Sequence, residues 1–176
     1  MPEAVALGMV HGRFQPFHNG HLAYLRGASA RARRLVVGIT NADVESTRQE
    51  PADPRRHLPE ENPSTFDERR AMVEAVLADE GIEDARIVPF PISYPERLAE
   101  IAPAGTVHFL RVFDDWGTTK VERLRRSGYE VVVLDEGAPK EISGAKVRAL
   151  LRARGDWESL VPPGTARVLR SLRRAP

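Results

Sequence analysis

Five short apolar runs recur along the chain, and each is rich in valine, isoleucine or phenylalanine. They cover residues 5–10, 35–39, 86–90, 107–112 and 129–134. Their apolar residues are continuous instead of alternating with polar ones, which is typical of parallel strands covered on both faces. The pattern therefore predicts five buried strands.

Between these runs lie patterns with helical spacing, at residues 18–33, 65–79, 94–101 and 119–127. Thr65 and Glu68 have the spacing of a capping box at the start of the second pattern. Because strand and helix patterns alternate, the sequence predicts an α/β fold with a doubly wound, parallel five-stranded sheet.

The last third of the chain is predicted to be helical, with segments at residues 143–154, 156–160 and 163–173. Pro163 stands at a plausible first helical position. The length of 176 residues fits one domain, since domains of ~100–200 residues are usual. We therefore expect a single domain over residues 1–176, with C-terminal helices at 143–173.

Residues 42–62 follow the second predicted strand and contain six carboxylates but little that is apolar. The segment is longer than an ordinary connection between elements. Two interpretations are open: a mobile loop over a site, or a solvated linker.

Charge and composition narrow the range of partners. The 26 basic and 25 acidic residues nearly cancel, which gives no reason to expect a nucleic-acid or membrane partner. The absence of cysteine excludes disulfides and thiolate chemistry and fits a reducing compartment. No apolar run approaches the ~20 residues of a membrane span, and no basic region precedes an apolar stretch at the start. We expect a soluble, cytoplasmic protein.

Residues 11–21 (HGRFQPFHNGH), at the end of the first predicted strand, contain the highest density of side chains that could bind or act on a ligand. Ligands bind beyond the carboxyl ends of the strands in open parallel sheets. Gly12 permits a close backbone approach, and Arg13 supplies a fork of donors suited to phosphate oxygens. A helix starting near His18 directs free N–H groups to the same place. The stretch predicts a phosphate-binding turn, although neither the P-loop pattern nor G-x-G-x-x-G occurs.

His18 and His21 are three residues apart at the start of this helix, so both side chains can face one anion. Imidazoles there can donate hydrogen bonds to a phosphoryl group during transfer. Two alternatives carry less weight: a zinc site, for which the spacing is wrong, and a purely structural cap. We expect no metal ligand among the side chains and no tightly bound cofactor.

Residues 12–21 resemble the signature of the nucleotidyltransferases with an H-x-G-H motif, and are most similar to archaeal-type nicotinamide mononucleotide adenylyltransferases. A second motif, at residues 142–148 (ISGAKVR), resembles the I-S-[GST]-x-x-[IV]-R element of that family. Residues 62–70 and 157–162 extend the similarity over most of the chain. The resemblance implies a Rossmann-like nucleotidyltransferase fold.

The implied reaction is attack of a phosphate acceptor on the α-phosphorus of a nucleoside triphosphate, with release of pyrophosphate and Mg²⁺ on the triphosphate. His18 and His21 would contact the α-phosphate and Arg13 the transferred or acceptor phosphate. Ser143 and Arg148 would bind the β- and γ-phosphates. The remaining residues of the implied nucleotide site are Gly12, Phe14, Gln15, Gly20, Ile142 and Gly144. The family also implies a homo-oligomer.

The acceptor segment departs from the family pattern, because the family's stacking tryptophan after the third strand is missing from residues 91–97. Tyr94 could stack in its place or simply pack. After the fourth strand, Trp116 could be a displaced stacking residue, and Asp114 or Asp115 could bind the acceptor. The alternative for these three is a capped turn.

Three hypotheses follow. The first is a nicotinamide mononucleotide adenylyltransferase, which uses ATP. The second is the same chemistry on another small phosphate or phosphonate, with CTP as a candidate donor. The third is a noncatalytic nucleotide sensor, which is disfavoured because the residues for phosphoryl transfer are present.

Overall fold

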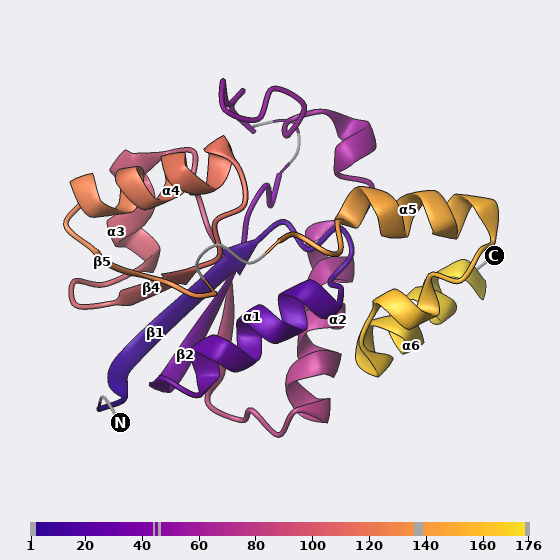
Figure 1. The fold of residues 1–176 in the computed structure, drawn as a ribbon, viewed down its shortest axis with the longest axis horizontal. Helices are drawn as coiled ribbons and strands as arrows, with labels where there is room; N and C mark the ends of the chain where they lie inside the picture. The colour runs from indigo at the N-terminus through magenta and orange to yellow at the C-terminus, as the bar shows by residue number, and fades with distance from the viewer. Residues whose placement is uncertain (1–2, 44, 46, 136–138, 175–176) are drawn as a thin grey trace.

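The computed structural model describes residues 3–43, 45, 47–135 and 139–174. Its centre is a sheet of five parallel strands in the order β3-β2-β1-β4-β5 (Figure 1). The strands are β1 (Val5–Gly12), β2 (Ala32–Ile39), β3 (Ala85–Pro89), β4 (Val107–Leu110) and β5 (Glu130–Val133). This confirms the predicted doubly wound sheet.

Six α-helices and three short 3₁₀ helices cover the sheet in the described part of the chain. The α-helices are α1 (Asn19–Ser29), α2 (Phe66–Asp79), α3 (Leu98–Ile101), α4 (Asp115–Arg126), α5 (Gly144–Ala153) and α6 (Pro163–Arg174). The 3₁₀ helices are η1 (Pro59–Glu61), η2 (Pro95–Arg97) and η3 (Glu158–Leu160). Figure 1 shows α3 and α4 on one face of the sheet and α1 and α2 on the other, with α5 and α6 beyond them.

Two apolar cores result, one on each face of the sheet. Val10 and Val37 belong to the core under α1, α2, α5 and α6, whereas their neighbours Met9 and Val36 belong to the core under α3 and α4. All four are buried. Apolar side chains are therefore needed at consecutive strand positions, which explains the continuous runs in the sequence.

Several predicted boundaries are wrong, each for a local reason. The first helix ends at Ser29, because residues from Ala32 onward pair with β1 and extend β2 toward its start. Helix α4 begins at Asp115 instead of residue 119, because the Asp114 side chain caps it by accepting from the Gly117 N–H at 2.8 Å. The pattern at 94–101 divides into η2 and the single turn α3, and 156–160 forms only η3.

The strand order places a crevice at the carboxyl ends of β1 and β4. These two strands are neighbours, but the chain proceeds from β1 to β2 on one side and from β4 to β5 on the other. Such a reversal leaves the space above the strand ends open, and ligands bind there in doubly wound folds. In Figure 1 the described part of residues 42–62 lies above this edge of the sheet. Whether that segment is mobile remains a prediction.

Arg69 on α2 joins the loops that border the crevice. Its side chain is fully buried, and its guanidinium donates to the carbonyl oxygens of Thr65, Arg13, Thr40 and Asn41 at 2.6–3.1 Å. Burial is the main cause that lowers the Arg69 pKa to about 10, which leaves it charged at neutral pH. One cation thus joins the loops that follow β1 and β2.

The part of the chain described here contains no helix that is both long and apolar enough to cross a membrane.

Replacing Arg69 with methionine should destabilise the protein by about 3 kcal/mol or more, because several buried carbonyls lose their donor. Arg70→Met is the matched control, since Arg70 is exposed and forms an ion pair with Glu74, one helical turn away. The free energy of unfolding from urea titrations measures both. An Arg69→Met protein that unfolds within 0.5 kcal/mol of the Arg70→Met control would refute the role assigned to Arg69.

Candidate active site

A cavity of about 380 Å³ opens at the carboxyl ends of β1 and β4. Four parts of the chain line it: the turn between β1 and α1, the loop before α2, the turn into α4, and the segment that leads into α5. The two motifs found in the sequence are more than a hundred residues apart and meet in this cavity. Twelve of the predicted site residues line it: Gly12, Arg13, Phe14, Gln15, His18, Gly20, His21, Asp114, Trp116, Ile142, Gly144 and Arg148.

The predicted residues Tyr94, Asp115 and Ser143 do not line the cavity. Tyr94 lies beneath the guanidinium of Arg48, 4.0 Å from the ring centroid. Asp115 is exposed in the first turn of α4. Ser143 caps α5 by accepting from the Lys146 N–H at 3.2 Å. Ligand contacts by these three side chains remain predictions.

The rings of His18 and His21 are stacked, with centroids 3.7 Å apart. His18 caps α1, since its Nδ1 accepts from the Gly20 N–H at 3.1 Å. His21 Nδ1 accepts from the His18 N–H at 3.2 Å. Because both Nδ1 atoms are acceptors, each neutral ring carries its proton on Nε2. The helix start thus provides two imidazole N–H donors side by side.

Burial keeps both imidazoles uncharged. It lowers the pKa of His18 to about 3, with smaller contributions from Lys140 and Arg111. The pKa of His21 is also held well below its ordinary value, first by burial and then by His18. At neutral pH these rings can donate hydrogen bonds, but they have no extra proton to give as general acids.

Glycine and phenylalanine positions make this geometry possible. A Cβ on Gly20 would lie 3.0 Å from the His18 ring, so only glycine leaves the ring its full space. Phe14 has a left-handed backbone with φ 54° and a buried ring, and that ring meets His21 edge-on at 4.9 Å. Phe14 therefore supports the His21 ring from behind.

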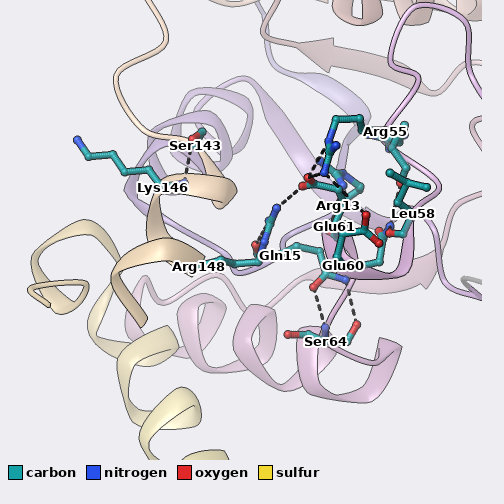
Figure 2. Close-up of polar contacts among 12 residues, drawn as sticks. Arg13, Gln15, Arg55, Leu58, Glu60, Glu61, Ser64, Ser143, Lys146 and Arg148 are labelled. Atoms are coloured by element: carbon teal, nitrogen blue, oxygen red, sulfur yellow. Dashed lines mark hydrogen bonds and ion pairs between the residues drawn. The ribbon is translucent and has the colours of Figure 1, made fainter. Parts of the chain in front are cut away.

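Arg148 on α5 connects the second motif to the first turn (Figure 2). Its guanidinium donates to the Gln15 carbonyl oxygen at 2.8 Å and forms an ion pair with the Glu61 carboxylate. The Arg13 guanidinium donates to the Glu61 carbonyl oxygen at 3.1 Å. The two guanidiniums predicted to bind phosphate thus converge on one residue of η1.

Close packing brings α5 against the first turn. A Cβ on Gly144 would lie 2.8 Å from the Gln15 carbonyl oxygen, so glycine is required where the helix begins. Gln15 and Ser64 exchange two hydrogen bonds, of 3.0 and 2.9 Å, which fix the loop before α2 to the same turn. The N-termini of α1 and α5 therefore both border the cavity, as an anion site requires.

At the other side of the cavity, Trp116 is 5% exposed, and cationic groups lie over its ring. The Arg56 guanidinium is 4.8 Å from the ring centroid and the Lys120 ammonium 5.9 Å. Asp114 is exposed and lines the cavity while capping α4. The proposed stacking face of Trp116 is thus already covered by the protein's own cations.

These features agree with a known family. The model described as cytidylyltransferase-like matches residues 9–167. The chain belongs to the cytidylyltransferase-like family. It is an enzyme of the nucleotidyltransferase type, which confirms the predicted class. The homo-oligomer and the cytoplasmic location remain predictions.

Two relatives illustrate the range of this family. The phosphonoformate cytidylyltransferase of Streptomyces viridochromogenes is 50% identical over 165 residues, which cover 93% of this chain and 90% of the relative. The nicotinamide-nucleotide adenylyltransferase of Picrophilus torridus is 32% identical over 167 residues, which cover 90% of this chain and 86% of the relative.

The fold also occurs in a bifunctional NMN adenylyltransferase/ADP ribose pyrophosphatase from Francisella tularensis, solved in complex with AMP and manganese. The TM-score is 0.63 at 15% identity, and the match covers 96% of this chain. This chain spans about half, 49%, of that longer protein. The comparison shows the shared nucleotidyltransferase fold.

Reasoning from the family motifs missed several residues that line the cavity, chiefly His11, Arg56, Arg111, Lys120 and Lys140. One signal was present in the composition, since the chain has only three lysines and two of them lie here. His11 belongs to the histidine-rich turn but lies outside the H-x-G-H motif. Arg56 and Arg111 gave no signal, because arginine is abundant throughout the chain.

Replacing His18 with asparagine should lower kcat by ~10²–10³-fold, because the Nε2–H donor is lost. Asparagine can still cap α1, so the free energy of unfolding should change by less than about 1 kcal/mol. Pyrophosphate release and urea unfolding measure the two effects. His57→Asn, outside the cavity, is the control, and an unchanged kcat in His18→Asn would contradict a role in transfer.

If Arg148 binds the triphosphate, as the family resemblance implies, replacing Glu61 with glutamine should tighten nucleotide binding on the order of 3–10-fold, because the triphosphate must displace the carboxylate from Arg148. Glu60→Gln is the matched control, since Glu60 is exposed and its carboxylate forms a long ion pair with Arg55, at 3.8 Å. Calorimetric titration with CTP and Mg²⁺ measures both variants. Weaker binding by Glu61→Gln would instead mean that Glu61 holds Arg148 in place for the nucleotide.

Proposed function

We propose that the enzyme transfers a cytidylyl group from CTP to a small phosphonate. A phosphonate oxygen attacks the α-phosphorus of CTP, and the bond from that phosphorus to the bridging oxygen of pyrophosphate breaks. This reaction needs positioned donors and charge stabilisation but no covalent nucleophile on the enzyme. The cavity supplies both.

The nucleotide half is assigned from the donors at the two helix starts. His18 and His21 present uncharged Nε2–H groups for the α-phosphate, where charge develops on the oxygens during transfer. Arg148, in the second turn of α5, pairs with a carboxylate and is suited to the β- and γ-phosphates once Glu61 moves away. Arg13 lies between them and is suited to the attacking or transferred group.

The choice of acceptor rests on one observation: Trp116 is buried with Arg56 and Lys120 over its ring. A nicotinamide ring needs an open aromatic face, and in the mononucleotide that ring is positively charged. Next to two cations it would be repelled. A small phosphonate has no ring and is negatively charged, so the same surroundings favour it.

The charge around the whole cavity supports an anionic acceptor. Six cationic side chains line it (Arg13, Arg56, Arg111, Lys120, Lys140 and Arg148), against three carboxylates (Asp53, Asp114 and Glu141).

The relative from Streptomyces, named for phosphonoformate and cytidylyl transfer, is also much more similar than the adenylyltransferases, at 50% against 32% identity or less. The preference for CTP over ATP rests on this similarity.

Mg²⁺ is proposed to arrive with the triphosphate. Among the described residues, no group of three or more histidines and carboxylates is placed to hold a metal ion. The ion would neutralise charge on the β- and γ-phosphates, with phosphate oxygens and water as most of its ligands.

Pyrophosphate release tests the proposal, with Mg²⁺ and with CTP or ATP crossed against phosphonoformate, methylphosphonate, nicotinamide mononucleotide and nicotinate mononucleotide. We expect the highest kcat/KM with CTP and a phosphonate. We expect this kcat/KM to exceed that of ATP with either pyridine mononucleotide by at least ~100-fold. The pyridine ring would find no free aromatic face to stack on, and its positive charge would be repelled by the two cations. Turnover that is fastest with ATP and nicotinamide mononucleotide would overturn the proposal.

A further inference from the structure

Buried hydrogen-bond donors without partners cluster on the acceptor side of the cavity. Within the described part of the chain, neither ring nitrogen of His11 has a hydrogen-bond partner, nor do Trp116 Nε1 and Arg56 Nε. The three residues are at most 6% exposed, and all of them line the cavity. Leaving a buried polar group unsatisfied costs about 1–3 kcal/mol, so such a cluster requires an explanation.

The cluster is assembled from three separate elements. His11 stands near the end of β1, Arg56 comes from the loop before α2, and Trp116 lies in the first turn of α4. Lys120 follows Trp116 by four residues and so lies on the same side of α4. Its ammonium is 5.9 Å from the Trp116 ring.

The two cations of the cluster form no ion pair within 4.0 Å among the described residues. Arg56 donates instead to the Thr40 hydroxyl at 2.7 Å. Burial, and next the charge of Arg56, lower the pKa of Lys120 to about 7. Burial and Arg13 lower the pKa of Arg56 to about 9. Asp53, Glu50 and Asp114 only partly offset the positive charge of Arg56, which remains available to an anion.

The chemistry of the cluster defines its ligand. Lysine, arginine and the indole N–H are donors only, and a neutral imidazole can donate through one nitrogen. An ionised carboxylate has two oxygens and accepts about four hydrogen bonds. The ligand group must also be compact, because the cavity of about 380 Å³ has to hold the nucleotide as well.

We propose that His11, Arg56, Trp116 and Lys120 form a second anion subsite, which binds a carboxylate attached to the phosphonate acceptor. The inference rests on the proposed function, and it adds that the enzyme recognises two anionic groups on one small molecule. The phosphonate faces Arg13 and the α-phosphate, while the carboxylate enters the cluster. This subsite selects carboxylated acceptors over simple phosphonates.

Calorimetry tests the subsite without turnover. The titrants are phosphonoformate and methylphosphonate, with Mg²⁺ and a CTP analogue that has a methylene bridge between the α- and β-phosphorus. The wild-type enzyme should bind phosphonoformate at least ~10-fold more tightly, since a charge-assisted hydrogen bond contributes this much. Lys120→Met should lose at least ~10-fold for phosphonoformate and less than about 2-fold for methylphosphonate.

Trp116→Phe provides an independent variant, because it keeps a ring beneath Arg56 and removes only the indole donor. It should weaken phosphonoformate binding by about 3–10-fold and leave methylphosphonate binding unchanged. Arg126→Met on the exposed side of α4 and Trp157→Phe in the other core are the matched controls. Neither control should change the preference.

Equal wild-type affinity for the two ligands, no binding of either, or equal losses for both in the variants would overturn the subsite. The proposed function fails separately, through the pyrophosphate assay. Lys120→Met could abolish the preference for phosphonoformate while the wild-type enzyme releases no pyrophosphate with CTP and phosphonates. That combination would support the subsite and reject the proposed reaction.

Discussion

The buried guanidinium of Arg69 is the contact on which the cavity depends. It joins α2 to the carbonyl groups of Arg13, Thr40 and Asn41, which belong to the turns that follow the two central strands. Those turns carry the phosphate-binding stretch and lead into the loop that contains Arg56 and Glu61. A single cation satisfied by carbonyl oxygens therefore sets the position of residues that would otherwise lie on separate surface loops.

Within the cavity that Arg69 helps to position, uncharged hydrogen-bond donors and charged ones occupy different places. His18 and His21 are kept neutral by burial at the point where the phosphoryl group would transfer. Cations line the same cavity. In the proposed complex, Arg148 would face the triphosphate, and Arg56 and Lys120 would face the acceptor. Neutral donors can stabilise developing charge without binding the ground state too tightly, and in the proposed reaction the flanking cations would hold the two anionic substrates.

The sequence alone predicted the fold and most of the residues that line the cavity beside the starts of α1 and α5. Continuous apolar runs and the capping box at Thr65 identified the strands and α2, because these signals are local. The motifs at residues 12–21 and 142–148 identified two turns that the fold brings to one cavity. The end of α1 could not be predicted, since pairing between β1 and β2 overrides the helical pattern there.

The acceptor half is where prediction from sequence was least informative. Trp116 was expected to be a candidate stacking residue, but packing places Arg56 and Lys120 over its ring. Arg56 lies sixty residues before Trp116 in a loop without regular pattern, so nothing local connects them. Glu61 likewise gave no sign in the sequence that it pairs with Arg148.

A crystal structure with Mg²⁺, phosphonoformate and the methylene-bridged CTP analogue tests the central claim most directly. We predict the α-phosphate oxygens within hydrogen-bond distance of His18 and His21 Nε2, the β- and γ-phosphates on Arg148 in place of Glu61, and the carboxylate among Lys120, Arg56 and Trp116. A nucleotide bound away from the two histidines, or an acceptor whose carboxylate points to solvent, would contradict the account.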